Sequence, residues 1–262
     1  MRTLRGPVAK GVNRVVWDLR YPPPVDSANV PVVAGRGGGG GGGGGGGRGG
    51  PPAAVPVGFP AGGEGGGGRG NVPLGPLVLP GKYSLSVKVA GVANALTGSV
   101  VVEPDPLTRF SSADRLARQA ILMRIYEWMK TLGEARLSAR ALVQQRDSIH
   151  GDFIGGGAAD GATRADSLNA RIARLSADVD RAFNAVNGQR APIEGWSGLP
   201  SADQQKSLGY AIEDAQKAAA ELNRLVATDI PAAYQQVARK GWGRKVNGVA
   251  APASGKAAST RP

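Results

Sequence analysis

The sequence predicts an α+β protein in which a partial antiparallel β-sheet is followed by an antiparallel three-helix bundle. Apolar and polar residues alternate along short segments within residues 1–106, which is typical of strands. Across residues 111–238 apolar residues instead recur at spacings of four and three, which is typical of packed helices. A glycine-rich stretch, residues 35–73, interrupts the first region, and residues 239–262 form a basic tail. We expect the stretch and the tail to be disordered.

Three segments carry the strand prediction. In NRVVWDLR (13–20), the residues Val15, Trp17 and Leu19 fall on one face, and Trp17 is expected to anchor a core. Residues 82–90 and 96–103 alternate in the same way and are separated by the turn sequence GVAN. The apolar face of the first of these two is formed by Tyr83, Leu85, Val87 and Val89. A sheet of only three or four strands hides one face only if something covers it.

The glycine-rich stretch is predicted to be a flexible insertion between two strands. Gly 42 and Pro 19 in the whole chain approach the level of low-complexity sequence, and the glycines concentrate here. Such a chain loses much entropy on ordering and buries little apolar surface. An alternative is an RGG-like segment that contacts RNA, for which only a few arginines and one aromatic residue, Phe59, are present.

Three apolar stripes predict three helices. They consist of Ile121, Ile125, Trp128, Leu132, Ala135, Ala139, Leu142 and Ile149, then Leu168, Ile172, Leu175, Val179, Ala182 and Val186, and then Leu208, Ile212, Ala215, Ala219, Leu222 and Val226. Each helix is preceded by a capping signature, at Ser111 with Asp114, Thr163 with Asp166, and Ser201 with Gln204. Pro231 is expected to end or kink the third helix, because it lacks a backbone donor.

The charge leaves two function classes open besides scaffolding. A formal net charge of +12 and a pI of about 10.5 are compatible with a nucleic-acid-binding protein that uses the RGG-like stretch and the cationic tail. The cations are scattered along the helices and the tail, without a compact basic run, which favours a solvated basic surface instead. Oligomerisation through the helices is a third possibility.

No residue constellation predicts a reaction, so we assign no catalytic, cofactor-binding or metal-ligating residue and no small-molecule ligand. The chain has no cysteine, and its one histidine, His150, is expected to lie at the end of the first helix, where a cation suits the helix dipole. The carboxylates Glu194, Glu213, Asp214, Glu221 and Asp229 are interpreted as solvated helix positions. Trp196 is expected to plug the end of the bundle, although a tryptophan also stacks on sugars or bases.

Several stretches resemble a known family. RTLRGPVAKGVNRVVWDLRYPPP, GPLVLPGKYSLSVKVAG and VVVEPDP are similar to the immunoglobulin-like module of the flagellar hook-capping type. More narrowly, they resemble the C-terminal region of bacterial exported proteins with sortilin-like, BNR-repeat β-propellers, which are often named glycosyl hydrolases. The helical segments GWSGLPSADQQKSLGYAIEDAQKAAAELNRL and ADSLNARIARLSADVDRAFNAVNG resemble the helices that follow the module in that family.

The resemblance implies a non-catalytic accessory region that packs against a β-propeller. No Asp-box motif of the propeller occurs in the chain, so we expect a C-terminal fragment of a longer exported protein or a split reading frame. Any glycosidase activity would reside in the propeller. Export to the periplasm or the cell exterior is implied by the family alone, because the sequence shows neither a signal peptide nor an apolar run of about 18 residues.

Overall fold

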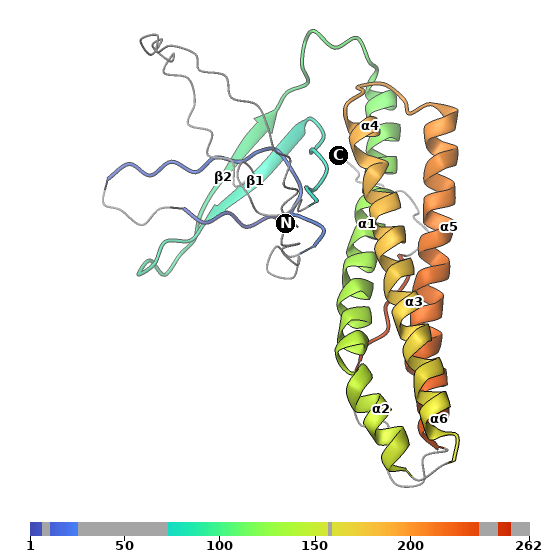
Figure 1. Ribbon diagram of the computed structural model, residues 1–262. Helices are drawn as coiled ribbons and strands as arrows, with labels where there is room; N and C mark the ends of the chain where they lie inside the picture. Colours follow the sequence, from blue (N-terminus) through green and yellow to red (C-terminus); the bar gives the residue numbers. More distant parts are fainter. Residues whose placement is uncertain (7–10, 26–72, 157–158, 236–245, 253–262) are drawn as a thin grey trace, which may run out of the picture.

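The computed structural model describes residues 1–6, 11–25, 73–156, 159–235 and 246–252. The fold is α+β, and a small two-stranded sheet stands to one side of a long helical body (Figure 1). The elements are β1 (Gly81–Val87), β2 (Leu96–Val102), α1 (Ser112–Gln144), α2 (Arg146–Gly155), α3 (Gly161–Gly188), α4 (Arg190–Glu194), α5 (Ala202–Arg224), the π-helix η2 (Leu225–Asp229) and α6 (Ile230–Gln235). The predicted disordered stretch at 35–73 lies outside the described residues, apart from Pro73.

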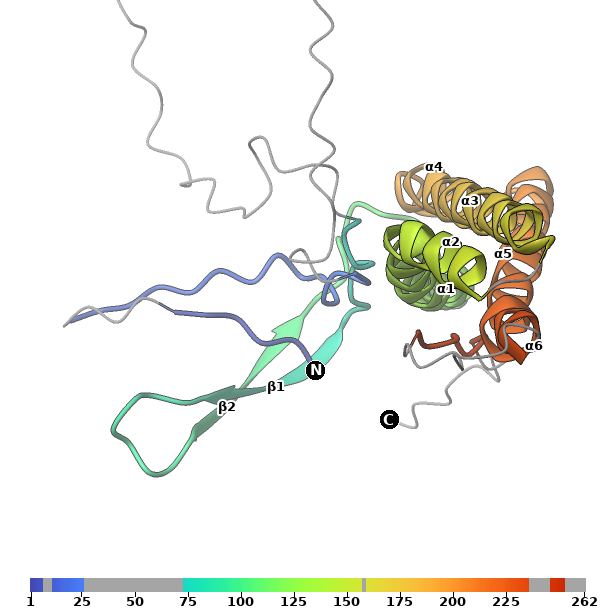
Figure 2. The ribbon, with the colours of Figure 1, turned by 60° about the horizontal axis from the view of Figure 1, so that its bottom comes forward.

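The hairpin predicted from residues 82–90 and 96–103 is confirmed. Strands β1 and β2 pair antiparallel, with Tyr83 opposite Val100 and Leu85 opposite Gly98. Gly91 makes the connecting turn with φ of +81°, a left-handed conformation that a residue with a side chain adopts only under strain. Figure 2 shows the hairpin pointing away from the helices.

The strand predicted at residues 13–20 is wrong. The Asp18 carboxylate accepts the backbone N–H of Arg20 at 3.1 Å, which closes a local turn. Leu19 inside this turn has φ of +57°, so the extended backbone of a strand is interrupted. What remains is one antiparallel bridge between Arg20 and Leu77. The described residues therefore form a sheet of two strands instead of three or four.

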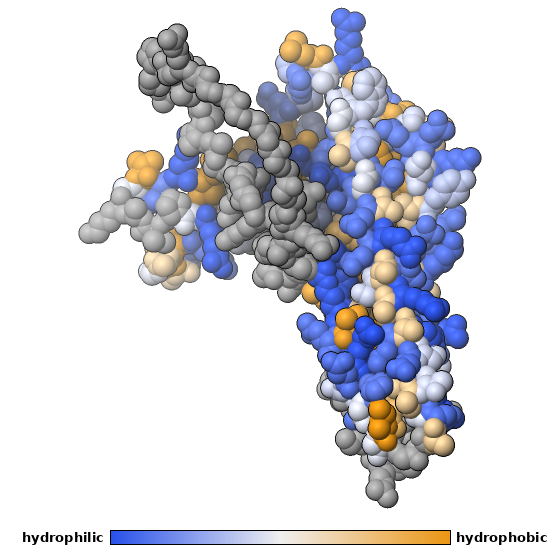
Figure 3. All heavy atoms as spheres, in the orientation of Figure 1, coloured by the Kyte–Doolittle hydropathy of each residue, from blue (hydrophilic) through white to orange (hydrophobic). Residues whose placement is uncertain are grey.

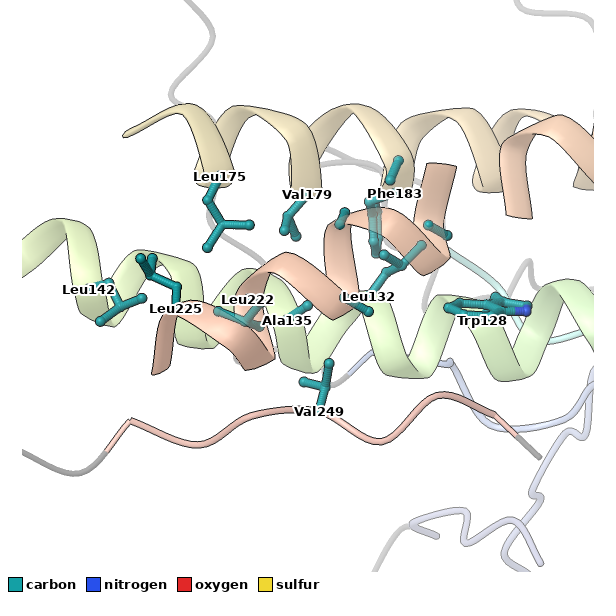
Figure 4. Packing of buried hydrophobic residues seen from close by; sticks show 14 of the residues in the cluster. Trp128, Leu132, Ala135, Leu142, Leu175, Val179, Phe183, Leu222, Leu225 and Val249 are labelled. Atoms are coloured by element: carbon teal, nitrogen blue, oxygen red, sulfur yellow. The ribbon is translucent and has the colours of Figure 1, made fainter. Parts of the chain in front are cut away.

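The three apolar stripes are confirmed as the core of the helical body. Helix α3 runs antiparallel to α1 and α5 and packs against both (Figure 1). All the predicted stripe residues are buried except Ile121 and Val226, which are partly buried against the same cluster. Figure 4 shows Leu132 near Phe183, and Leu222 near Ala135, between the three helices.

The first helix is shorter than predicted. The N–H of Gln145 bonds to the carbonyl of Leu142, three residues back, so the α-helical pattern tightens there and α1 gives way to α2. The carbonyl of Arg146, in the first turn of α2, accepts a bond from the buried side chain of Asn169 on α3 at 3.1 Å. His150 therefore lies inside α2 and does not cap a helix, which corrects the expectation from sequence.

Two of the three predicted capping boxes are confirmed. Ser111 and Ser201 each accept the backbone N–H three residues on, and Asp114 and Gln204 bond back to them. The box predicted at Thr163 is wrong, because α3 begins at Gly161 and Thr163 already lies inside its first turn. At Gly161 a Cβ atom would lie 2.5 Å from the carbonyl oxygen of Phe153, so the glycine lets the start of α3 approach α2.

Pro231 does not end a helix, because it lies in the first turn of α6, and the third helix is interrupted ahead of it. Helix α5 ends at Arg224, and the chain widens into the π-helix η2 before Pro231. Ile230 donates its N–H to the carbonyl of Leu225, five residues back. None of the helices in the described ranges combines the length and the apolar character needed to cross a bilayer.

The tail prediction for residues 239–262 is wrong for residues 246–252. This short segment lies along α1 and α5, and Val246 and Val249 are buried in the core cluster. In Figure 4 the side chain of Val249 points from the segment toward Ala135 and Leu222. The rest of the predicted tail lies outside the described residues.

We expect Ser201→Ala to lower the free energy of unfolding by about 1 kcal/mol, because an N–H at the start of α5 loses its acceptor. Thr163→Ala is the matched control, since Thr163 is exposed inside α3 and caps nothing. Urea unfolding followed by circular dichroism measures both. Equal losses for the two variants would contradict the assignment of the helix starts.

Candidate functional site

Three of the five helical carboxylates, Glu194, Glu221 and Asp229, pair with arginines. Glu221 and Asp229 both accept hydrogen bonds from Arg171 on α3, at 2.9 and 2.5 Å. The bond to Asp229 and then the bond to Glu221 raise the pKa of Arg171, so the cation is held more firmly in its charged form. These contacts join α3 to α5 and η2.

Glu194 is held between two guanidinium groups. Its Oε1 accepts a bond from Arg20 and its Oε2 a bond from Arg190, each at 2.5 Å. The side chain of Glu194 is only 10% exposed, so it is not a solvated helix position as the sequence suggested. Arg20 also donates to the carbonyl of Gly75 at 2.9 Å. One carboxylate thus connects the N-terminal segment, the chain just before β1, and α4.

The proline-rich segments 21–25 and 73–80, which lie on either side of the glycine-rich stretch, pack against α1. Leu77 offers its carbonyl oxygen to the buried amide of Gln119 at 3.0 Å. At Gly75 a Cβ atom would lie 2.3 Å from the carbonyl oxygen of Tyr21, so only glycine permits the two segments to pass this closely. Tyr21 and Tyr126 lie with ring centroids 6.1 Å apart. Partial burial is the main cause that raises the pKa of Tyr126 and keeps its phenol protonated.

The residues considered for binding or metal chemistry do not converge. The imidazole Nε2 of His150 is 3.6 Å from Asp166 on α3, in an open surface position. Trp196 is exposed and meets Phe110 edge-on, with centroids 5.5 Å apart, so it does not plug the helical body. Within the described ranges, no three histidine, cysteine or carboxylate side chains lie close enough to hold a metal ion.

Two further tryptophans among the described residues, Trp17 and Trp128, have structural positions. Trp128 is buried in the core of the helical body, as its spacing predicted. Trp17 is half-buried and packs edge-on against Tyr83 of β1, with centroids 5.3 Å apart. Trp17 therefore anchors the N-terminal segment on the hairpin, although not from a strand.

A small depression lies between the proline segments and α1. It is lined by Pro24, Pro73, Leu74, Pro76, Leu122, Ile125, Tyr126, Met129, Asn187 and Arg190. Its interior has room for about one water molecule. Ligand pockets in proteins usually enclose several hundred Å³, so this depression is not a small-molecule site.

The feature that does stand out is the apolar face of the hairpin. Because directly paired residues share a face, Leu85, Val87, Leu96 and Val100 lie on the same side of the sheet. They are 45%, 52%, 63% and 36% exposed. At the end of this face near Tyr83, the ring of Trp17 packs against the sheet. The opposite face consists of Lys82, Ser84, Ser86, Thr97, Ser99 and Val101.

The hairpin face differs from the outside of the helical body. On the side of the molecule drawn in Figure 3, the helices present mostly hydrophilic residues, as expected of a solvated surface. A two-stranded sheet with an uncovered apolar face is marginal in water by itself. We therefore take the apolar hairpin face, defined by Leu85, Val87, Leu96 and Val100, as the candidate interaction surface.

No family model, curated protein or solved structure matches this chain. The resemblance to the C-terminal region of BNR-repeat proteins accordingly stays a prediction.

Sequence reasoning identified the alternation that makes the hairpin face but missed the junction around Glu194. Arg20 and Glu194 are 174 positions apart, and neither stands in a recognisable motif. No single-sequence signal pairs them. The glycine at 75 next to proline was the one visible hint of a close approach between segments.

We expect Glu194→Gln to lower the free energy of unfolding by about 2 kcal/mol, because two half-buried guanidinium groups lose their charged partner. Asp214→Asn is the matched control, since its pair with Lys217 is exposed and contributes little. Urea denaturation measures both variants. A loss for Asp214→Asn as large as that for Glu194→Gln would contradict the structural role of the junction.

Proposed function

We propose that this chain is a non-catalytic accessory and scaffolding region of an exported sortilin-like, BNR-repeat protein of the glycosyl-hydrolase-named type. In this proposal residues 1–106 are a partial immunoglobulin-like module, and residues 111–238 are a three-helix bundle that supports it. The observation that carries the proposal is the uncovered apolar face of the β1–β2 hairpin.

Burial of that face would give a partner substantial binding energy. Each fully buried aliphatic side chain of this size contributes about 1.5–3 kcal/mol relative to exposure. Four such residues lie together on the hairpin face, and all are exposed in the isolated chain. The partner that the resemblance implies is a β-propeller, whose own sheets offer a second surface for packing.

The junction at Glu194 supports a scaffolding role. Arg20 bonds both to Glu194 on α4 and to Gly75 just before β1, and Gln119 on α1 bonds to Leu77, so these contacts tie the base of the hairpin to the helices. A hairpin that is fixed at its base presents its apolar face in a defined direction, which lowers the entropy lost on association. The arginine-bound carboxylates then serve packing, and any hydrolysis belongs to the propeller.

We expect the full chain to bind a purified β-propeller domain of this protein class, taken from the same genome. The double variant Leu85→Lys with Leu96→Lys should bind at least about tenfold more weakly, because two charges would be buried in the interface. The control is Ser84→Lys with Thr97→Lys, which adds the same charges to the opposite, exposed face. Isothermal titration calorimetry measures all three affinities.

Two results would count against the proposal. One is the absence of saturable binding by the unmodified chain. The other is an equal loss for both double variants, which would mean that added charge, not the apolar hairpin face, affects association. Circular dichroism of each variant verifies that the hairpin and helices are retained.

The net charge of +12 is the observation that favours the second candidate function, nucleic-acid binding. Several cations of the helical body are already paired, among them Arg136 with Asp180 at 2.6 Å and Arg171 with two carboxylates. We therefore expect weak binding to single-stranded RNA that vanishes at moderate salt, measured by fluorescence anisotropy. Tight binding with a steep salt dependence would favour this second function instead.

A further inference from the structure

The segment 246–252 is held by side chains that bond to its backbone. The amide of Asn223, on α5, donates to the carbonyl oxygen of Val249 at 2.8 Å and accepts the N–H of the same residue at 2.8 Å. Thr131, on α1, donates its hydroxyl to the carbonyl of Ala250 at 3.1 Å. These are contacts that any extended peptide backbone can make, as in strand addition to a sheet.

Two apolar side chains seat the segment in the seam between α1 and α5. Val246 and Val249 are both buried, whereas Asn247, Gly248 and Ala250 between and after them are exposed. Figure 4 shows the segment running beside both helices, with Val249 inserted between them. The seam therefore has two apolar subsites, for residues three apart in the segment. In addition, Asn223 and Thr131 form hydrogen bonds to the segment's backbone.

The position before Val249 is selective for glycine. A Cβ atom at residue 248 would lie 2.5 Å from the Asn223 side-chain oxygen, which itself is fixed by its bond to Val249. The seam thus holds the sequence Val-Asn-Gly-Val. Its two valines are buried, and its glycine is required because the Asn223 side chain lies so close.

The seam is incomplete without a peptide. Thr131 is 7% exposed, and removing the segment would take away the acceptor of its hydroxyl and uncover the apolar side chains around Val249. The segment follows α6 after ten residues, 236–245, a length that reaches at most about 40 Å. The contacts themselves do not depend on which copy of the chain supplies the segment.

We propose that the α1–α5 seam is a peptide-binding site and that residues 246–252 of a second copy of this chain can occupy it. The exchanged arrangement keeps every contact described above and changes only the connection between the segment and α6. Such an exchange of identical elements is an accessible route to dimers. This proposal is independent of the hairpin face and of the proposed accessory function.

The experiment uses two full-length variants that complement each other. Val249→Asp disables the segment but keeps the seam, and Asn223→Ala disables the seam but keeps the segment. We expect each variant alone to be a monomer of 26.7 kDa and the mixture to give a dimer of twice that mass by light scattering. A mixture in which Asn223→Ala is combined with a chain carrying both substitutions is the control and should stay monomeric.

A fluorescein-labelled peptide of residues 246–252 gives an independent measurement. It should bind the Val249→Asp chain in a saturable manner, since the tethered segment no longer competes at a high effective concentration. A peptide with alanine at the Gly248 position should bind about tenfold more weakly or worse, because of the clash with Asn223. Anisotropy measures both peptides.

Should Val249→Asp fail to fold, Gly248→Leu replaces it, because residue 248 is exposed and the substitution ejects the segment without burying a charge. A mixture that remains monomeric, together with a peptide that does not bind the folded variant, would overturn the proposal. The segment would then be a permanent part of one chain's core.

Discussion

Burial around the middle of α1 is the constraint on which the rest of the structure depends. Trp128, Met129, Thr131, Leu132 and Gly133 are all buried, which is more than one face of a helix can supply. Helices α3 and α5 cover one side, the proline segments cover a second, and residues 246–252 lie against a third. The segments at the two ends of the chain are therefore positioned by the same helix.

This burial explains which predictions from sequence held. The stripes that run through Leu132, Leu175 and Leu222 obey the spacing of a helix that packs on two neighbours, and that spacing is visible in one sequence. The second face of α1, where Leu122 and Met129 meet the proline segments, follows the same spacing but is covered by irregular backbone. The spacing of apolar residues shows which face of a helix is buried, but it does not show which segment of the chain covers that face.

The predictions from sequence that failed did so for local reasons, which strand and helix propensities do not include. Residues 13–20 alternate as a strand should, but the Asp18 carboxylate captures the Arg20 N–H and turns the backbone at Leu19. Thr163 stands at a capping spacing, yet α3 begins at Gly161, where the lack of a Cβ lets the backbone pass close to Phe153. Likewise the junction at Glu194 joins residues far apart in the sequence, and only the folded chain brings them together.

The hairpin and the seam represent two outcomes of one physical problem. Each has apolar side chains that the three helices do not cover. In the seam the chain supplies its own cover, because Val249 fits between α1 and α5 and Asn223 satisfies its backbone. At the hairpin Trp17 packs against Tyr83, whereas Leu85 and Leu96 are exposed. The core cluster includes no residue of β1 or β2, so the exposed apolar area of the hairpin lies outside the packing that holds the described helices together.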